Sequence, residues 1–129
     1  MTSKIVRVVL ANAIALSLAG AVPASAASGD VTKTGTCSGS TNWKLKLGPR
    51  DGGVIEVEYQ VDSNVVGQTW RVRIFQNGTK IFGGPRVTKA PSGSFTVRVT
   101  ATDTAGTDAF KGRALNDATG ELCVGRASV

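Results

Sequence analysis

The chain has 129 residues, the length of one domain, and carries a net charge of +6 at neutral pH. It contains no histidine, which removes the most common general base, the Ser-His and Cys-His dyads and most transition-metal sites. The G-x-S-x-G, P-loop and Rossmann glycine motifs are also absent from the sequence. We therefore expect no enzyme and no cofactor.

Residues 1–26 have the pattern of a signal peptide. Lys4 and Arg7 form a positive n-region, an apolar stretch runs from Val8 to Val22, and Ala24-Ser25-Ala26 is a cleavage site of the A-x-A type. The apolar stretch is shorter than the roughly 18–20 residues that a membrane span needs. The pattern therefore predicts a secreted protein whose mature form has no membrane segment.

The predicted mature domain, residues 27–129, loses two cations with the signal peptide and keeps a net charge of +4. Its basic residues are scattered over several segments and form no run. We therefore expect a solvated surface and no nucleic-acid partner. Cys37 and Cys123 are the only cysteines, and an even count in an exported chain predicts one disulfide. That bridge would join the first strand to the last.

Alternation of apolar and polar residues predicts a series of short antiparallel strands. Residues 30–37 and 42–47 form the first two strands, and the Pro- and Gly-rich segment 48–53 forms the turn that follows. From Val54 to Gly84 we expect a meander of three strands with its apolar side chains on the inner face.

The first two strands of this meander are expected to pair with Tyr59 opposite Trp70. A shift of one residue would turn every side chain to the wrong face. On the outer face the same register forms two ion pairs, Glu58 with Arg71 and Glu56 with Arg73. We therefore expect the two glutamates to be solvated and paired, and not the carboxylate pair of a glycosidase.

Asn77-Gly78 between apolar runs predicts a type I′ hairpin turn, which needs positive φ at both positions. In the register of this turn, Ile74 faces Ile81, and two aromatic rings lie diagonally on the outer face. An exposed aromatic pair beside charged groups suits contact with a protein or a glycan. The candidate binding surface therefore consists of Phe75, Phe82, Arg73 and Lys80. The alternative is that another strand covers this face or that a bulge turns one ring inward.

The longest predicted loop, Gly83–Gly93, is expected to carry the chain from one sheet to the other. Further strands are predicted at 94–102, 108–115 and 121–129. Seven or eight short strands separated by turn signals predict an all-β fold. We expect a single immunoglobulin-like or fibronectin-III-like β-sandwich of 7–8 antiparallel strands, present as a monomer.

Asp62 and Asn64 are the best candidates for a metal site, because calcium takes several oxygen ligands from one loop. The alternative is an Asx-turn, in which these side chains bond the loop's own backbone. We favour the Asx-turn, since the segment lacks the further acidic ligands that calcium sites use.

Several segments are shared with one group of exported proteins: Ala24-Ser25-Ala26, Cys37, Asp62-Ser63-Asn64 with Gly67 and Trp70, and Thr119-Gly120-Glu121-Leu122-Cys123. With them the chain resembles small exported β-sandwich proteins of actinobacteria. The resemblance implies an extracellular β-domain and assigns no functional residue. Enediyne-binding apoproteins and subtilisin inhibitors are also small exported β-domains, but they carry two disulfides.

We expect a secreted, non-catalytic binding or interaction module for an extracellular protein or glycan. Two alternatives remain open. One is a carrier of a small ligand, with its pocket between the two sheets. The other is a secreted protease inhibitor that uses the Gly83–Gly93 loop.

Overall fold

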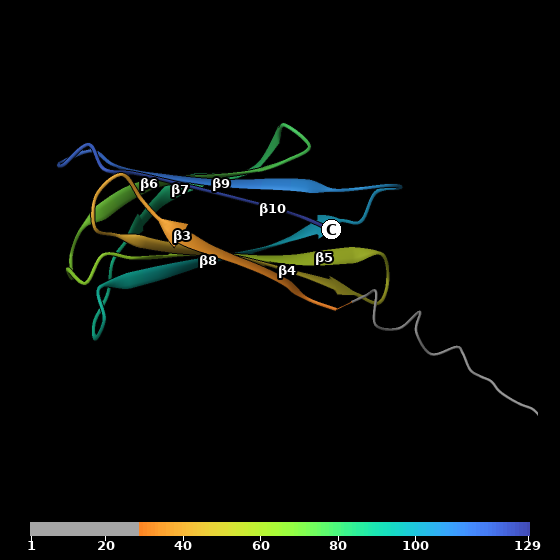
Figure 1. The fold of residues 1–129 in the computed structure, drawn as a ribbon, viewed down its shortest axis with the longest axis horizontal. Helices are drawn as coiled ribbons and strands as arrows, with labels where there is room; N and C mark the ends of the chain where they lie inside the picture. The colour runs from red at the N-terminus through yellow and green to blue at the C-terminus, as the bar shows by residue number, and fades with distance from the viewer. Residues whose placement is uncertain (1–28) are drawn as a thin grey trace, which may run out of the picture.

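The computed structural model describes residues 29–129, so the predicted signal peptide lies outside the described residues. Eight strands make up this part of the chain (Figure 1): β3 (Val31–Thr36), β4 (Asn42–Arg50), β5 (Val54–Asp62), β6 (Thr69–Gln76), β7 (Thr79–Val87), β8 (Ser94–Thr102), β9 (Ala109–Asn116) and β10 (Leu122–Ser128). The all-β class and the strand number confirm the prediction. No helix in the described range is long and apolar enough to cross a membrane.

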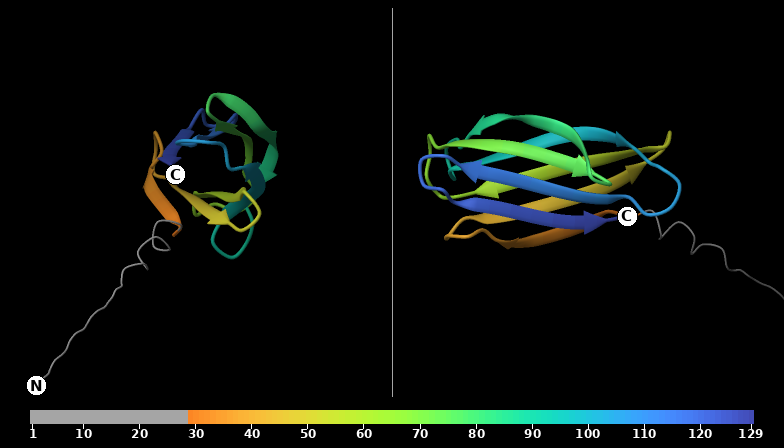
Figure 2. Two further views of the ribbon diagram at one scale, coloured as in Figure 1. Left: turned by 90° about the vertical axis from the view of Figure 1, so that its right-hand side faces the viewer. Right: turned by 90° about the horizontal axis from the view of Figure 1, so that it is seen from above.

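The strands form two antiparallel sheets, in the orders β10-β9-β6-β7 and β3-β4-β5-β8. Figure 2 shows the two sheets facing each other as the layers of a sandwich. On the immunoglobulin strand scheme, β4, β5 and β8 correspond to A, B and E. The strands β7, β6, β9 and β10 correspond to C′, C, F and G, and β3 is an added edge strand. The predicted immunoglobulin-like sandwich is therefore confirmed.

The inward-facing positions of both sheets build one apolar core. Leucine, valine and isoleucine from β4, β5 and β6 alternate with polar residues, as a half-buried strand requires. The buried apolar side chains are Leu45, Leu47, Ile55, Val57, Tyr59, Val61, Trp70, Val72, Ile74, Phe95, Val97, Ala101, Phe110, Ala114, Cys123 and Ala127. These side chains occupy the space between the sheets.

Glycines make room in this core for two aromatic rings. A Cβ atom would lie 2.7 Å from the Trp43 ring if it were placed on Gly35, and 2.5 Å from it on Gly125. The indole therefore fits between β3 and β10 because both neighbouring residues are glycines. Gly112 in β9 does the same for Tyr59, with a Cβ distance of 2.7 Å. Burial raises the pKa of the Tyr59 phenol. The hydroxyl stays protonated and donates a hydrogen bond to a main-chain carbonyl of β10.

The predicted disulfide between Cys37 and Cys123 is present and joins the residue after β3 to the last strand. The Glu121 carboxylate reinforces this connection by accepting hydrogen bonds from the Gly39 and Thr41 main-chain N–H groups at 3.0 Å. The turn after β3 is therefore held against the start of β10 by one covalent bond and several hydrogen bonds.

The predicted pairing of the first two meander strands is wrong, because β5 and β6 belong to different sheets. Tyr59 lies opposite Leu45 and Val97, whereas Trp70 lies opposite Arg86 and Asn116. Alternation shows which side of a strand is buried. It does not show which sheet the strand belongs to, because both sheets bury one side against the same core. The two aromatic residues therefore both point inward, from opposite layers.

The predicted hairpin at Asn77-Gly78 is confirmed, with φ values of 49° and 85° at the two turn residues. Its register is correct only next to the turn. An irregularity between Ile74 and Phe75 leaves Ile81 unpaired and puts Phe82 opposite Ile74. A β-bulge of this kind places one extra residue on one strand and shifts all later pairs.

The predicted Gly83–Gly93 loop is about half strand. The β7 strand continues through Pro85 to Val87, which is possible because β7 lies at the edge of its sheet. The crossing to the other sheet, which we predicted, is made by the short turn between Val87 and Ser94.

Candidate functional site

The outer face of the β10-β9-β6-β7 sheet is strongly basic. Side chains alternate along a strand, so the residues between the buried ones point away from the core. The four strands contain no aspartate or glutamate. Their outward positions carry six cations: Arg71, Arg73, Lys80, Lys111, Arg113 and Arg126. We call this surface the basic face, and it consists of these six residues and Phe75.

The strand register sets the spacing of the charges. Phe75 lies between Lys80 on β7 and Lys111 on β9, and Lys111 lies opposite Arg126 on β10. Neighbouring strands are about 4.8 Å apart, and outward residues along one strand are separated by roughly 6.7 Å. On β6, β9 and β10 the cations therefore follow one another at backbone intervals of about 5–7 Å, and Phe75 separates Lys80 on β7 from Lys111.

Two pairs of these cations are direct cross-strand neighbours. Arg73 lies opposite Arg113, and Lys111 lies opposite Arg126. Like charges in directly opposite positions destabilise a sheet, each by up to roughly 1 kcal/mol.

One of the six cations has a carboxylate partner. Arg71 forms a two-fold contact with Asp117 in the β9–β10 turn, at 2.9 Å for each nitrogen–oxygen pair. Within residues 29–129, Arg73, Lys80, Lys111, Arg113 and Arg126 form no ion pair. Most of the positive charge of the basic face is therefore not neutralised by the described part of the protein.

The outer face of the other sheet shows the opposite arrangement. Arg50 contacts Asp30 at 2.8 Å and Glu56 at 3.2 Å, and Arg98 contacts Glu58 at 3.6 Å. The hydrogen bond from Arg50 holds the pKa of Asp30 below its usual value. The two predicted meander ion pairs are thus wrong in their partners, and Glu56 and Glu58 are paired within their own sheet. Arg71 and Arg73 are left on the basic face without these glutamates.

The surface of the basic face is hollowed in two places. A hollow of about 290 Å³ lies over β6 and β7, lined by Arg71, Arg73 and Lys80 together with Gly83, Gly84 and Pro85. It forms where β7 has Gly83, which carries no side chain, opposite Arg73. A second hollow of about 350 Å³ lies near the β6–β7 turn and includes Phe75, Lys111 and Arg126 in its lining. Each hollow is lined by more than one cation.

The predicted aromatic pair is divided between the two faces of its sheet. Phe75 points outward, half-buried, with the Lys111 ammonium 4.8 Å from its ring centre. Phe82 lies opposite the fully buried Ile74 and packs against the core. The bulge that we named as an alternative has turned this second ring inward. The structure therefore brings Phe75, Arg73 and Lys80 together and excludes Phe82 from that surface.

A buried carboxylate fixes the end of the sheet that carries Phe75. Asp108 is fully buried and accepts hydrogen bonds from Gln76, Asn77 and the Thr104 main-chain N–H, at 3.1, 3.0 and 3.0 Å. Burial alone would raise the pKa of Asp108, but hydrogen bonds from Thr104, Gln76 and Asn77 bring this pKa below its ordinary value. The charged carboxylate therefore ties the β6–β7 turn to the loop before β9.

The metal candidate forms the Asx-turn. The Asp62 carboxylate accepts a hydrogen bond from the Asn64 main-chain N–H at 3.1 Å, and Asn64 has a positive φ of 62°. Within residues 29–129 no group of three or more His, Cys, Asp or Glu side chains could hold a metal ion. The oxygen that would begin a calcium shell is thus engaged by its own loop.

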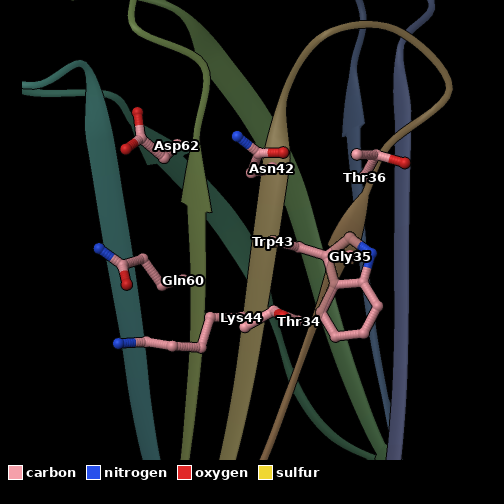
Figure 3. Close-up of a pocket in the computed structure, with 8 residues that line it drawn as sticks. All are labelled: Thr34, Gly35, Thr36, Asn42, Trp43, Lys44, Gln60 and Asp62. Carbon is pink, nitrogen blue, oxygen red and sulfur yellow. The ribbon is translucent and has the colours of Figure 1, made fainter.

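A separate groove of about 430 Å³ lies at the loop end of the β3-β4-β5 sheet (Figure 3). Lys44, Gln60 and Asp62 project beside one another from β4 and β5, while the Trp43 ring lies at Gly35 of β3. One cation and one carboxylate line this groove together with neutral groups, so no single charge dominates it.

Four of the six cations of the basic face were not part of the predicted binding surface: Arg71, Lys111, Arg113 and Arg126. Lys111, Arg113 and Arg126 occupy the polar phase of the two last predicted strands, so their outward direction was readable. Their position in the same sheet as β6 was not readable, because the sequence does not show which strands share a sheet.

Comparison of the chain with protein-family models, with curated proteins and with solved structures gave no match. The structure therefore assigns the protein to a class by its fold: it is an immunoglobulin-like β-sandwich with one disulfide and one basic sheet face.

Proposed function

We propose that the protein is an exported, non-catalytic binding module that holds a negatively charged extracellular partner on its basic face. One observation carries this proposal. The four strands of one sheet contain six outward cations and no acidic residue, while on the other sheet Arg50 and Arg98 are each paired with a carboxylate. A surface of one charge sign attracts partners of the opposite sign and speeds their association.

Export is supported by two independent features. The first is the signal-peptide pattern of residues 1–26. The second is the Cys37–Cys123 disulfide, a bond that persists in oxidising compartments. The sandwich and its single bridge also agree with the proposed kinship to small exported actinobacterial proteins.

Two further features support a role in binding and not in catalysis. The whole sequence lacks histidine, and Glu56 and Glu58 are each engaged with an arginine. The cross-strand pairs Arg73–Arg113 and Lys111–Arg126 reduce the stability of the sheet in the unbound protein. A bound anion would relieve that repulsion, so binding and folding stability are linked at this face.

The two other functions have less support. A small-ligand carrier needs space between the sheets, where the core side chains now lie. An inhibitor needs a long exposed loop, and Gly83–Val87 of the expected loop is part of β7.

The test is a pull-down from extracellular and cell-surface material with the tagged mature protein, residues 27–129. The protein is run beside a double variant, Arg73→Glu with Arg113→Glu. A matched control, Lys33→Glu with Lys44→Glu, changes the charge equally on exposed positions of the other sheet. Capture by the wild type and the control, but not by the double variant, supports the proposal. Equal capture by all three proteins would contradict it.

A further inference from the structure

We infer that the partner of the basic face is a linear acidic polysaccharide, laid diagonally across the sheet. This inference rests on the proposed function and specifies the chemistry of the ligand. Its recognition would come from repeated anionic groups on the chain, each placed between neighbouring cations. Carboxylate and sulfate groups on sugars both have this chemistry.

The order of the cations favours a polymer over a single small anion. Cross-strand and along-strand neighbours connect five of them in one band, in the order Arg126, Lys111, Arg113, Arg73 and Arg71. With two steps of about 4.8 Å between strands and two of roughly 6.7 Å along them, the two ends of the band are about 16 Å apart in a straight line. A single phosphate or carboxylate would reach two of these cations. A chain with an anionic group at each repeat can contact all five.

The two hollows lie at the two ends of this band. The one over β7 is lined by Arg71, Arg73 and Lys80, and the one near the β6–β7 turn by Lys111 and Arg126. Both are open depressions on a sheet surface. A flexible chain can follow such a surface, with an anionic group entering each hollow.

The aromatic content argues against single-stranded nucleic acid. Proteins that bind single strands combine a positive groove with aromatic rings on which successive bases stack. Phe75 is the one aromatic residue at an outward position of these four strands, and the Lys111 ammonium lies 4.8 Å from its ring centre. No row of rings is available for consecutive bases on this face.

A folded protein partner is also less well matched. The centre of a protein interface is depleted of charge and anchored by buried aromatic or apolar side chains. The centre of the basic face is the Arg73–Arg113 pair. Val65 and Val66, at 50% and 56% exposure, lie in the β5–β6 loop at one end of the sandwich. Val87, at 40% exposure, is the last residue of the edge strand β7, away from this central pair.

The experiment is isothermal titration calorimetry, in which residues 27–129 are titrated with four probes of matched length. Each titration is done at 50 and at 200 mM NaCl. The probes are a heparin oligosaccharide, an oligogalacturonate, an oligo(dT) and a neutral dextran fragment. We expect at least one of the two acidic polysaccharides to bind tenfold or more tightly than oligo(dT), and dextran not to bind. With five ionic contacts the slope of log K against log salt is about −3.5 for a flexible strand, a loss of roughly 100-fold between the two salt concentrations.

The same titration is repeated with the variants. Arg73→Glu with Arg113→Glu is expected to lose at least tenfold in affinity and to flatten the salt dependence, whereas Lys33→Glu with Lys44→Glu should keep wild-type binding of the polysaccharide. Oligo(dT) binding as tight as the polysaccharides would overturn the inference and leave the proposed function standing. Binding of no anionic probe, or binding that survives in the double variant, would overturn both.

Discussion

Replacing Arg113 by glutamate should stabilise the protein while weakening its binding to anions. In the sheet, Arg113 lies directly opposite Arg73, with Cβ atoms roughly 5 Å apart. The substitution removes one repulsive pair and creates an attractive one, and each of these changes is worth roughly 0.2–1 kcal/mol. We therefore expect the free energy of unfolding to rise by about 1 kcal/mol.

For a domain of this size, a change of about 1 kcal/mol shifts Tm by roughly 4–8 °C. Scanning calorimetry at 20 mM salt should show that rise for Arg113→Glu and a smaller rise for Arg113→Gln, which removes the repulsion without adding attraction. At 1 M salt, where the screening length falls to about 3 Å, the gain should largely disappear. As a control, Lys33→Glu should leave Tm unchanged, because Lys33 is exposed and forms no ion pair within residues 29–129.

A decrease in Tm for Arg113→Glu at low salt would refute this reasoning. So would a gain of equal size at 20 mM and 1 M salt, because the stabilisation would then not be electrostatic. Combined with the titrations above, the expected result is a variant that is more stable and binds less well. Ordinary destabilisation does not produce that combination.

Three further predictions concern the parts of the fold that support the site. Asp108→Ala should lose roughly 1–3 kcal/mol by leaving buried donors unpaired. Because the folded pKa of Asp108 is lowered, its stabilisation is present above the unfolded pKa of about 3.9. It is lost as the pH falls through the folded pKa, so urea unfolding between pH 5 and 2 should show an acid-dependent loss in the wild type that the variant lacks. Gly125→Ala should lose roughly 1–3 kcal/mol in urea unfolding by overpacking against Trp43. Replacing Cys37 and Cys123 together by alanine should lower the unfolding free energy by about 4 kcal/mol.

Each of these has a result that would count against it. If the Asp108→Ala variant had the same acid-unfolding profile as the wild type, the Asp108 carboxylate would not be a source of the acid-dependent stability. A Gly125→Ala variant as stable as the wild type, with unshifted tryptophan fluorescence, would show that β10 has space to move. Loss of the disulfide without loss of stability would mean that the unfolded chain gains little freedom when Cys37 and Cys123 separate.

The sequence was sufficient for features that depend on neighbouring residues. The positive φ values of Asn77 and Gly78 follow from the turn type, and the burial of Trp70 and Tyr59 follows from alternation. The disulfide was predicted from two cysteines in a chain that carries a signal-peptide pattern. The turn and the burial pattern depend on neighbouring residues alone, and each of the two cysteines has only the other as a possible partner.

The errors concern which strands share a sheet. Glu58 has acceptable arginine partners on two strands, and charge complementarity alone does not choose between Arg71 and Arg98. The six residues between β5 and β6 allow either a hairpin or a crossing to the other layer. The bulge before Phe82 has no marker in the residue types around it, so the direction of that ring was not predictable. For the same reasons, the gathering of cations on one face became visible only in three dimensions.

The bridge between Cys37 and Cys123, with a sequence separation of 86, encloses most of residues 29–129 in a covalent ring. Five of the six cations of the basic face lie inside this ring, and Arg126 follows it directly. In the exported protein that we propose, a single protease cut in any turn between the two cysteines would release no fragment. The disulfide would keep all the strands of the cut protein in one molecule. The basic face could therefore stay assembled after one peptide bond of the ring is cleaved.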